Sequence, residues 1–260
     1  MKLGLVTYNM TYDLDLDALL ALCEQTGIEG VELRTEHAHG VEVALSAKQR
    51  TAVKQRFADS TVELVGLGTV CEFHSSDAAE LERNVELGKA WAQLAADVGA
   101  GGIKLRPNGL RDDVPFEQTC EQIGRAWCDV AAFAQDLGVE TRMEVHGHGT
   151  QQPEVFRQIV AFADHPNAKV CWNSNQADMD ANGSIASFFD AVKERIGTVH
   201  ITEIGRYQYP WQDLFNRLEA IGYHGFCLAE IQHNPDPERF MTYYRTLFDL
   251  YTGQWHWPRR

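Results

Sequence analysis

The strongest constraint on this chain is a regular alternation of short apolar segments with longer amphipathic ones. Eight short apolar runs recur at roughly 30-residue spacing, and a segment with helical periodicity follows each of them. Strands separated by helices pair in parallel through right-handed crossovers, and eight such units in about 250 residues are what a closed barrel needs. The alternation therefore predicts an α/β fold, a (β/α)₈ TIM barrel.

The expected elements can be placed by their start and stop signals. Asp15 and Ser46 are expected N-caps, Gly27 and Gly138 are expected to end helices, and Pro153 suits a first helical turn. We expect strands at residues 3–8, 30–34, 62–68 (extended to 74), 103–106, from 141, 168–172, 198–202 and 225–231. We expect helices at about 15–27, 46–60, 77–98, 116–137, 153–163, 184–195, 211–221 and 237–251.

The main alternative fold is a doubly wound open sheet. No G-x-G-x-x-G follows the first expected strand, where Thr7-Tyr-Asn-Met stands instead. A length of 260 residues fits one barrel as well as two small domains, but there is no convincing linker. We therefore expect a single domain over 1–260 with a C-terminal tail at about 252–260. Trp255 and Trp257 in that tail are expected to pack on the barrel or on a neighbouring subunit, and a homo-oligomer is one option.

Composition excludes several classes of partner. The formal charge of −14 disfavours nucleic acid and anionic membrane surfaces, because both need a basic face. The six cysteines contain no C-x-x-C pair, which indicates reduced thiols rather than disulfides or a zinc knuckle. The N-terminus runs straight into a strand, and no apolar run approaches membrane-spanning length. We expect a soluble cytoplasmic protein.

The stretch from Thr141 to Gly149 is the first candidate for a functional site. Glu144, His146 and His148 are two residues apart, so in an extended segment they point to the same side. A solvated surface strand could carry the same three residues. The functional interpretation gains weight because other expected strands also end in polar residues.

In a barrel the carboxyl ends of all strands converge on one mouth. Most of the histidines fall at these ends, whereas a random surface distribution would place most of them on helices and opposite loops. This clustering predicts a polar pocket. Its candidates, in strand order, are Arg34, His37 and His39; Glu72 and His74; Lys104 and Arg106; Glu144, His146 and His148; Asn173, Asn175 and Gln176; His200 and Glu203; and Glu230, Gln232 and His233.

Four of these candidates form a plausible metal shell. Glu144, His200 and Glu230, with an oxygen from Asn173, would offer carboxylate, imidazole and amide ligands with open positions, which suits Mn²⁺, Mg²⁺, Co²⁺ or Zn²⁺. The two carboxylates could also act as general base and general acid. His146 is expected beside this shell or facing the substrate.

The chain resembles the sugar phosphate isomerase/epimerase group, also called xylose isomerase-like barrels, over essentially its whole length. The matching motifs are Met143-Glu-Val-His146, Val199-His-Ile-Thr202, Gly222-Tyr-His-Gly225 and Leu228-Ala-Glu230. In similar proteins Glu, Asp, His and Glu from strands five to eight hold a metal, and the two Glu exchange protons with the substrate. The resemblance implies these roles for Glu144, position 173, His200 and Glu230.

The sixth strand departs from the family pattern. The family usually has D-x-x-H there, whereas this chain has Asn173 and Gln176. An amide oxygen can bind a hard cation but brings no charge, so we expect weaker metal binding and partial occupancy. Gln176 can orient a substrate hydroxyl, but it cannot transfer a proton as histidine does.

Three cations near the predicted mouth have two interpretations. Arg34, Lys104 and Arg106 could bind a substrate carboxylate or phosphate, or they could pair with Glu32, Glu36, Glu72 or Glu144. The histidines of the mouth loops could likewise bind substrate or only solvate the loops. The full set of expected substrate-binding residues is Arg34, His37, His74, Lys104, Arg106, His146 and Gln176.

The sequence thus favours a metal-dependent isomerase or epimerase that acts on a ketose, keto-sugar or related polyol. One of Glu144 and Glu230 would remove a proton and the other would return one, through an enediolate. A lyase or dehydratase on a keto-sugar or sugar acid would use the same parts. A sugar-binding barrel that has lost catalysis is a further alternative, motivated by Asn173 and Gln176. Metal-assisted phosphodiester cleavage is disfavoured by the negative charge.

Overall fold

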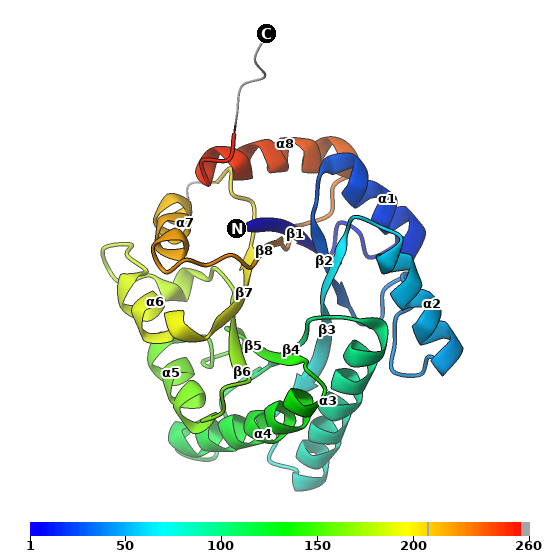
Figure 1. Ribbon diagram of the computed structural model, residues 1–260. Coiled ribbons are helices and arrows are strands. Elements are labelled where there is room, and N and C mark those ends of the chain that lie inside the picture. The colour runs from blue at the N-terminus through cyan, green and yellow to red at the C-terminus, as the bar shows by residue number, and fades with distance from the viewer. Residues whose placement is uncertain (207, 256–260) are drawn as a thin grey trace.

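The computed structural model describes residues 1–206 and 208–255, and within them a closed parallel barrel is surrounded by α-helices (Figure 1). The strands are β1 (Lys2–Val6), β2 (Gly30–Arg34), β3 (Glu63–Glu72), β4 (Gly102–Arg106), β5 (Glu140–Glu144), β6 (Ala168–Trp172), β7 (Ile196–Ile201) and β8 (Phe226–Ala229). The helices are α1 (Leu16–Thr26), α2 (Ala47–Ala58), α3 (Ala78–Val98), α4 (Phe116–Asp136), α5 (Pro153–Phe162), α6 (Ala186–Val192), α7 (Trp211–Ala220) and α8 (Pro237–Tyr251).

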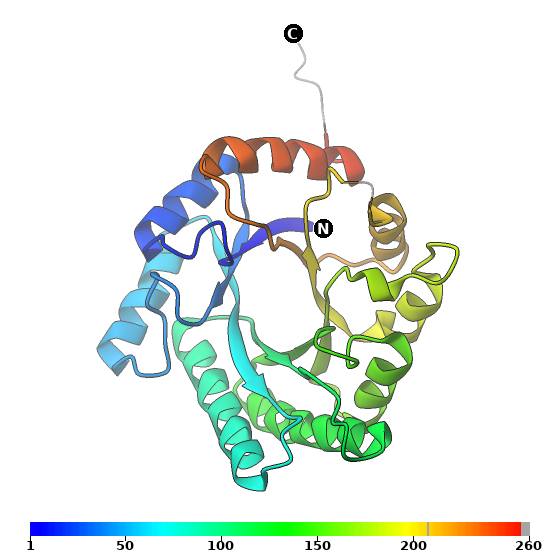
Figure 2. The same cartoon turned by 180° about the vertical axis from the view of Figure 1, so that it is seen from behind.

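The order of the strands confirms the predicted (β/α)₈ barrel. Each strand pairs in parallel with the next along the chain, and β1 pairs with β8, Lys2 opposite Phe226. This last pairing closes the sheet, so the open doubly wound alternative is wrong. Figures 1 and 2 show the ring of helices around the barrel from its two ends.

The helix boundaries follow the expected local signals. Asp15 accepts a hydrogen bond from the Ala18 N–H, and Ser46 forms a capping box with Gln49. Gly27 ends α1 with φ 71°, a left-handed conformation that glycine adopts without a Cβ clash. The segment expected as one helix from Ser184 to about Arg195 differs. It is α6 followed by a 3₁₀ turn at Lys193–Arg195, and Ser184 Oγ accepts from the N–H of the first residue of α6.

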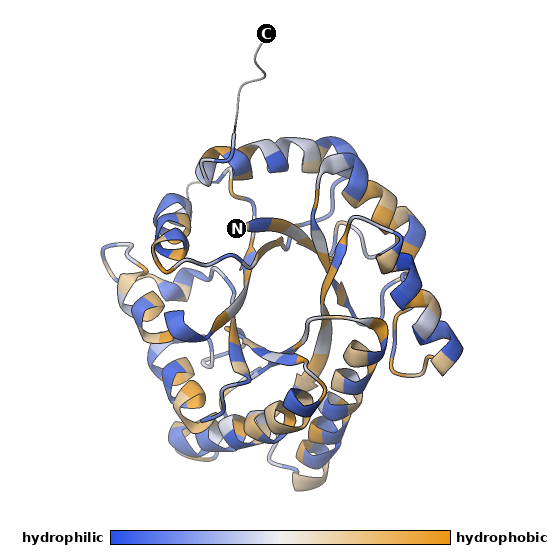
Figure 3. Cartoon of the chain, viewed as in Figure 1, coloured by the Kyte–Doolittle hydropathy of each residue, from blue (hydrophilic) through white to orange (hydrophobic). Residues whose placement is uncertain are grey.

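The main core lies between the barrel and the helices. Helices and strands both carry hydrophobic and hydrophilic residues in Figure 3, as expected for elements with one buried side. Trp127 of α4 is fully buried, and its indole N–H donates to Thr141 Oγ1 on β5 at 2.9 Å. The six cysteine thiols are free, as expected, and five of them are buried, where a thiol packs as a small apolar side chain.

The interior of the barrel is divided into an apolar part and a charged part. Val6, Val65, Phe226 and Leu228 form a small separate cluster, and a Cβ at Gly30 would lie 2.6 Å from the Phe226 ring. A second group of interior side chains is charged or titratable yet almost completely buried. Its members include Glu32, Lys104, Glu144 and His200. Such groups are costly to bury without partners, so this part of the barrel is where a function is to be sought.

The chain end and the helices bear on two further expectations. Gln254 Nε2 donates to the Met1 carbonyl at 3.0 Å, so the start of the expected tail contacts the N-terminus. Trp257 and the rest of 256–260 lie outside the described residues. Among the described helices, none combines the length and apolarity required to cross a membrane.

Candidate active site

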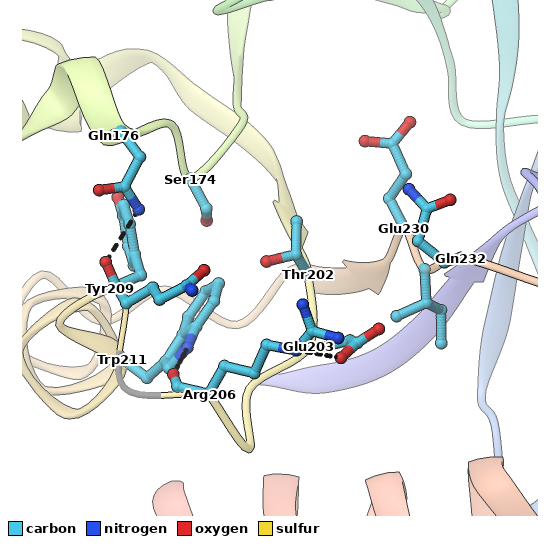
Figure 4. Close-up of a pocket in the computed structure, with 11 residues that line it drawn as sticks. Ser174, Gln176, Thr202, Glu203, Arg206, Tyr209, Trp211, Glu230 and Gln232 are labelled. Atoms are coloured by element: carbon cyan, nitrogen blue, oxygen red, sulfur yellow. Dashed lines mark hydrogen bonds and ion pairs between the residues drawn. The ribbon is translucent and has the colours of Figure 1, made fainter.

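A polar cavity of about 330 Å³ opens at the carboxyl end of the barrel strands. A second cavity of about 190 Å³ adjoins it and shares Ser174, Thr202, Glu230 and Gln232 with it. Glu230 therefore borders both cavities, as Figure 4 shows for the second one. The first cavity is lined by Tyr8, Arg34, Lys104, Arg106, Glu144, His146, Asn173, Ser174, Asn175, Thr202, Glu230 and Gln232.

His200, which is fully buried, lies among three carboxylates. Its Nδ1 is 3.5 Å from Glu144 Oε1 and 3.6 Å from Glu230 Oε2. Its Nε2 is 3.3 Å from Glu32 Oε1. The structure thus brings together Glu144, His200 and Glu230, the three residues that the sequence placed at the ends of strands five, seven and eight.

Lys104 forms an ion pair with Glu144, and both residues line the first cavity. Its ammonium lies 2.6 Å from Glu144 Oε2, and both side chains are buried. Burial alone would raise the pKa of Glu144, but Lys104 and then His200 outweigh it, so the pKa of Glu144 lies below its ordinary value. Burial opposes the charge on Lys104 too, and Glu144 outweighs that effect and raises the pKa of Lys104. Both groups are therefore charged at neutral pH.

The donor set around His200 fits a divalent ion. Glu144, His200 and Glu230 each offer one ligand atom, and these three atoms lie within 4.8 Å of one another. Both ring nitrogens of His200 are buried without a hydrogen bond among the described residues, which leaves Nδ1 with a free lone pair or proton facing two carboxylates. Asn173 lines the same cavity, and no hydrogen bond of its side chain to a described residue is present. Two carboxylates, one imidazole and one amide suit Mn²⁺, Mg²⁺, Co²⁺ or Zn²⁺.

Glu32 is the site residue that the sequence reasoning missed. Its side chain is completely buried. Burial alone would raise the pKa of Glu32, but the nearby His200 lowers that pKa below its ordinary value. An anionic Glu32 next to Nε2 favours a proton on that nitrogen, so Nδ1, which faces Glu144 and Glu230, is the ring nitrogen that would bind a metal. The available signal was a carboxylate in the middle of an apolar strand, between Val31 and Leu33.

The three predicted cations of the mouth have different partners. Arg106 Nη2 lies 2.6 Å from Glu72 Oε1, and Lys104 is paired with Glu144 as described. For these two residues the expected pairing with glutamates is what the structure shows. Arg34 instead contacts His37, with 3.3 Å between Nη1 and Nε2.

The remaining predicted substrate-binding residues are divided between the cavities and their surroundings. His146 lines the first cavity, and its Nδ1 lies 3.1 Å from Asn108 Oδ1. Gln176 lines only the second cavity, where its amide donates to the Gln208 carbonyl, away from Glu230 (Figure 4). His37 and His74 line neither cavity, and His74 Nδ1 is 4.0 Å from Glu72 Oε2.

Three loops at the mouth contain a non-glycine residue with positive φ. Glu36 follows β2 (φ 67°), Asn108 follows β4 (φ 61°) and Ser174 follows β6 (φ 44°). Such conformations cost energy and concentrate near functional sites. Ser174 is held in place because its hydroxyl donates to the His200 carbonyl at 2.8 Å. Ser174 and its neighbour Asn173 both line the first cavity.

A family model for the xylose isomerase-like TIM barrel matches residues 20–243. The chain belongs to this family. The match includes seven of the eight strands and all the residues of the proposed metal shell. A comparison with curated protein sequences finds no significant match.

Several solved structures share the fold of this xylose isomerase-like barrel. The D-psicose 3-epimerase of Clostridium cellulolyticum H10 is 15% identical, with a TM-score of 0.79 over 97% of this chain and 99% of that one. The IolI protein with a binding zinc atom is 14% identical, with a TM-score of 0.79 over 98% and 99%. The probable 3-DHS dehydratase AsbF of Bacillus anthracis is 14% identical, with a TM-score of 0.73 over 96% and 98%. At these identities the likeness establishes the fold.

Proposed function

We propose that this protein is a metal-dependent isomerase or epimerase that acts on a small carbohydrate with a carbonyl next to a hydroxyl-bearing carbon. The observation that carries the proposal is the approach of Glu144 and Glu230 to the same nitrogen of His200, at 3.5 and 3.6 Å. Two carboxylates on one polar cavity can remove a proton from a substrate carbon and return one to it.

The metal would be held by Glu144, His200 and Glu230 with the amide oxygen of Asn173. What a divalent ion supplies when bound there is Lewis-acid polarisation of a substrate carbonyl, which acidifies the adjacent C–H. The ammonium group of Lys104 contacts Glu144 Oε2, whereas Glu144 Oε1 faces His200. Glu32 would hold the His200 ring in the orientation and tautomer that ligation requires.

The chain's own side chains would carry the proton transfers. One of Glu144 and Glu230 takes the proton from the substrate carbon, and the other returns a proton to the enediolate. Lys104, buried and positively charged beside Glu144, favours the negative charge that develops on the substrate. Hydrogen-bonding groups that could orient substrate hydroxyls are His146 Nε2 and the amide nitrogen of Gln232, because His146 Nδ1 contacts Asn108 and Gln232 Oε1 accepts from Asn9.

The similar structures support this proposal in their general chemistry. One of them is a D-psicose 3-epimerase and another contains a bound zinc atom. The polar lining of the cavity agrees with a polyhydroxylated substrate. We further propose that the protein acts without nucleic acid or membrane partners, in the cytoplasm.

The test is proton exchange in D₂O with a panel of ketoses and keto-sugars, with Mn²⁺ added to the protein. NMR would show loss of the C–H signal next to the carbonyl, together with a new isomer or epimer. We expect Glu144→Gln and Glu230→Gln each to lower the rate by about 10²–10⁴-fold. Glu82→Gln, an exposed substitution on α3, serves as the matched control. Unchanged turnover in either active-site variant would refute the mechanism.

A dehydratase is the second candidate, because the fold is shared with the probable 3-DHS dehydratase AsbF. It would use the same first step and then lose a β-hydroxyl group from the enediolate. The same experiment separates the two functions. Deuterium incorporation without loss of water from the product indicates epimerisation or isomerisation, and an unsaturated or deoxy product indicates dehydration.

A sugar-binding barrel without catalysis is the remaining alternative, and it is motivated by Asn173 in place of the family's aspartate. Elemental analysis of protein purified without chelator addresses it. A metal-free protein that gains no thermal stability with Mn²⁺ and exchanges no substrate proton would favour the binding module.

A further inference from the structure

The charge balance of the first cavity distinguishes one cation from the other two. Lys104 and Arg106 lie 2.6 Å from carboxylate oxygens, so each is already neutralised by the protein. Arg34 has no carboxylate within 4.0 Å of its guanidinium among residues 1–206 and 208–255. Its only side-chain hydrogen bond in that part of the chain is with His37. One positive charge therefore faces the cavity without a protein counter-charge.

Arg34 is nevertheless held in a defined position. Burial and then the neighbouring guanidinium lower the pKa of His37, so its imidazole is neutral at pH 7. A neutral ring can accept the Arg34 N–H at Nε2 while Nδ1 faces Thr7 Oγ1 at 3.3 Å. The Thr7 hydroxyl also accepts the backbone N–H of Arg34, and the Tyr8 ring lies 5.9 Å from the guanidinium carbon. His37 therefore acts as a positioning residue for Arg34.

A fixed, unpaired guanidinium is suited to one type of group. Its parallel N–H donors match the oxygens of a carboxylate or a phosphate, and the interaction is charge-assisted. A purely neutral sugar would leave this charge uncompensated in a partly buried site. In a chain with a net charge of −14, such a local cation is also what allows an anionic ligand to bind.

We infer that the substrate carries an anionic oxygen group, a carboxylate or a phosphate, and that Arg34 binds it. The inference rests on the proposed function, which places the reacting carbon of the substrate at Glu144 and Glu230. Arg34 ends β2, whereas Glu144 and Glu230 lie at β5 and just after β8, and all three line one cavity. The anionic group would therefore be at one end of the substrate and the reacting carbon at another.

The test compares binding of three matched compounds by calorimetry: a ketohexose, the corresponding keto-aldonic acid and the ketohexose phosphate ester. We expect one of the two anionic compounds to bind at least about 10-fold more tightly than the neutral sugar, because hydrogen bonds between charged groups are stronger than those between neutral groups. The preferred anion identifies the source of the charge. Equal binding of all three compounds, or no binding of either anion, would overturn the inference.

Variants of Arg34 provide the second arm. Arg34→Gln should remove the preference for the anion, so that the anionic compound and the neutral sugar bind the variant with similar affinity. Arg34→Lys should retain more of the preference for a phosphate than for a carboxylate, because lysine keeps the charge but loses the two-pronged geometry. Arg83→Gln, an exposed substitution on α3, is the matched control. An Arg34→Gln protein that unfolds at the temperature of the native protein and keeps the full preference would contradict the inference.

The outcome for the proposed function is read separately in D₂O. Arg34-dependent binding of an anion without any C–H exchange would leave the inference standing and count against the isomerase. Exchange on the neutral sugar and on neither anionic compound would support the isomerase and overturn the anionic substrate.

Discussion

Lys104 and Glu144, which both line the candidate active site, form an ion pair of 2.6 Å, with only 5% and 3% of their side chains exposed. The pair places a permanent positive charge beside one of the proposed metal ligands. With Asn173 in place of aspartate, the ligand set also has one negative charge fewer than the family pattern. Both features lower the negative charge available to a cation, and the following predictions separate their effects.

Removal of Lys104 should strongly destabilise the protein. Lys104→Met leaves Glu144 as a buried carboxylate without its main partner, and breaking a buried pair typically costs about 3–5 kcal/mol. The measurement is the free energy of unfolding from urea titration at pH 7. The double variant Lys104→Met/Glu144→Gln should lose less stability than the sum of the single variants. Additive losses would show that the two side chains do not stabilise each other.

Glu32 should control metal affinity without contacting substrate. Glu32→Gln removes the anion beside His200 Nε2, so the ring is no longer held in the tautomer that leaves Nδ1 free. Loss of such an outer partner typically lowers metal affinity by about 10–100-fold. Titration of the metal-free protein with Mn²⁺ or Co²⁺ by calorimetry measures it, with Glu82→Gln as the control. A folded Glu32→Gln protein that binds the metal as tightly as the native protein would show that Glu32 does not control metal affinity.

Restoring a carboxylate at position 173 should strengthen metal binding. Asn173→Asp adds a negative charge to a set of oxygen and nitrogen ligands, which favours a hard divalent ion. We expect at least about a 10-fold tighter Kd and a larger increase in Tm on addition of Mn²⁺. Asn182→Asp, exposed in the loop before α6, adds the same charge away from the site. If both variants change the affinity equally, Asn173 is not a ligand.

Asp178 should make stability depend on pH near neutrality. Burial raises its pKa to about 7, and hydrogen bonds from Tyr209 and Asn175 offset only part of that effect. Because the unfolded chain releases this proton near pH 4, the folded state binds more protons between about pH 4 and 7. The Asp178 contribution to stability is therefore greatest at acidic pH and is lost as pH rises through about 7.

Asp178→Asn removes this titration. As pH rises from 5 to 8, the native protein should lose stability relative to the variant, by on the order of a few kcal/mol in the free energy of unfolding. Urea titrations across this range measure it, with the exposed Asp136→Asn as the control. A difference that stays constant with pH would show that Asp178 is already ionised at pH 5.

The fold was predictable because its signals are local. Hydrophobic periodicity marked the strands and helices, and capping residues such as Asp15 and Ser46 marked helix starts. The alternation of the two element types then permits few topologies. The split of the segment expected at 184–195 was not predictable, because tertiary packing decides whether a short helix continues or tightens into a 3₁₀ turn.

The candidate site was predictable where it depends on topology alone. Glu144, His200 and Glu230 end or follow strands, and parallel strands in a barrel bring those ends together. Glu32 was missed because it lies within a strand, where only the barrel interior shows which side chains meet. Gln176 was expected beside the other site residues, but the turn after β6 directs it to the second cavity and to Gln208.

The amino-acid sequence by itself determined the barrel, the end of it that carries the polar residues and the departure at Asn173, because these depend on periodicity, chain order and residue type. Only the tertiary structure decided which charges are already paired. Lys104, Arg106 and Arg34 look equivalent in the sequence, yet the first two contact carboxylates and the third contacts a neutral imidazole. That distinction depends on strand register and side-chain rotamers across the barrel, which no local pattern encodes.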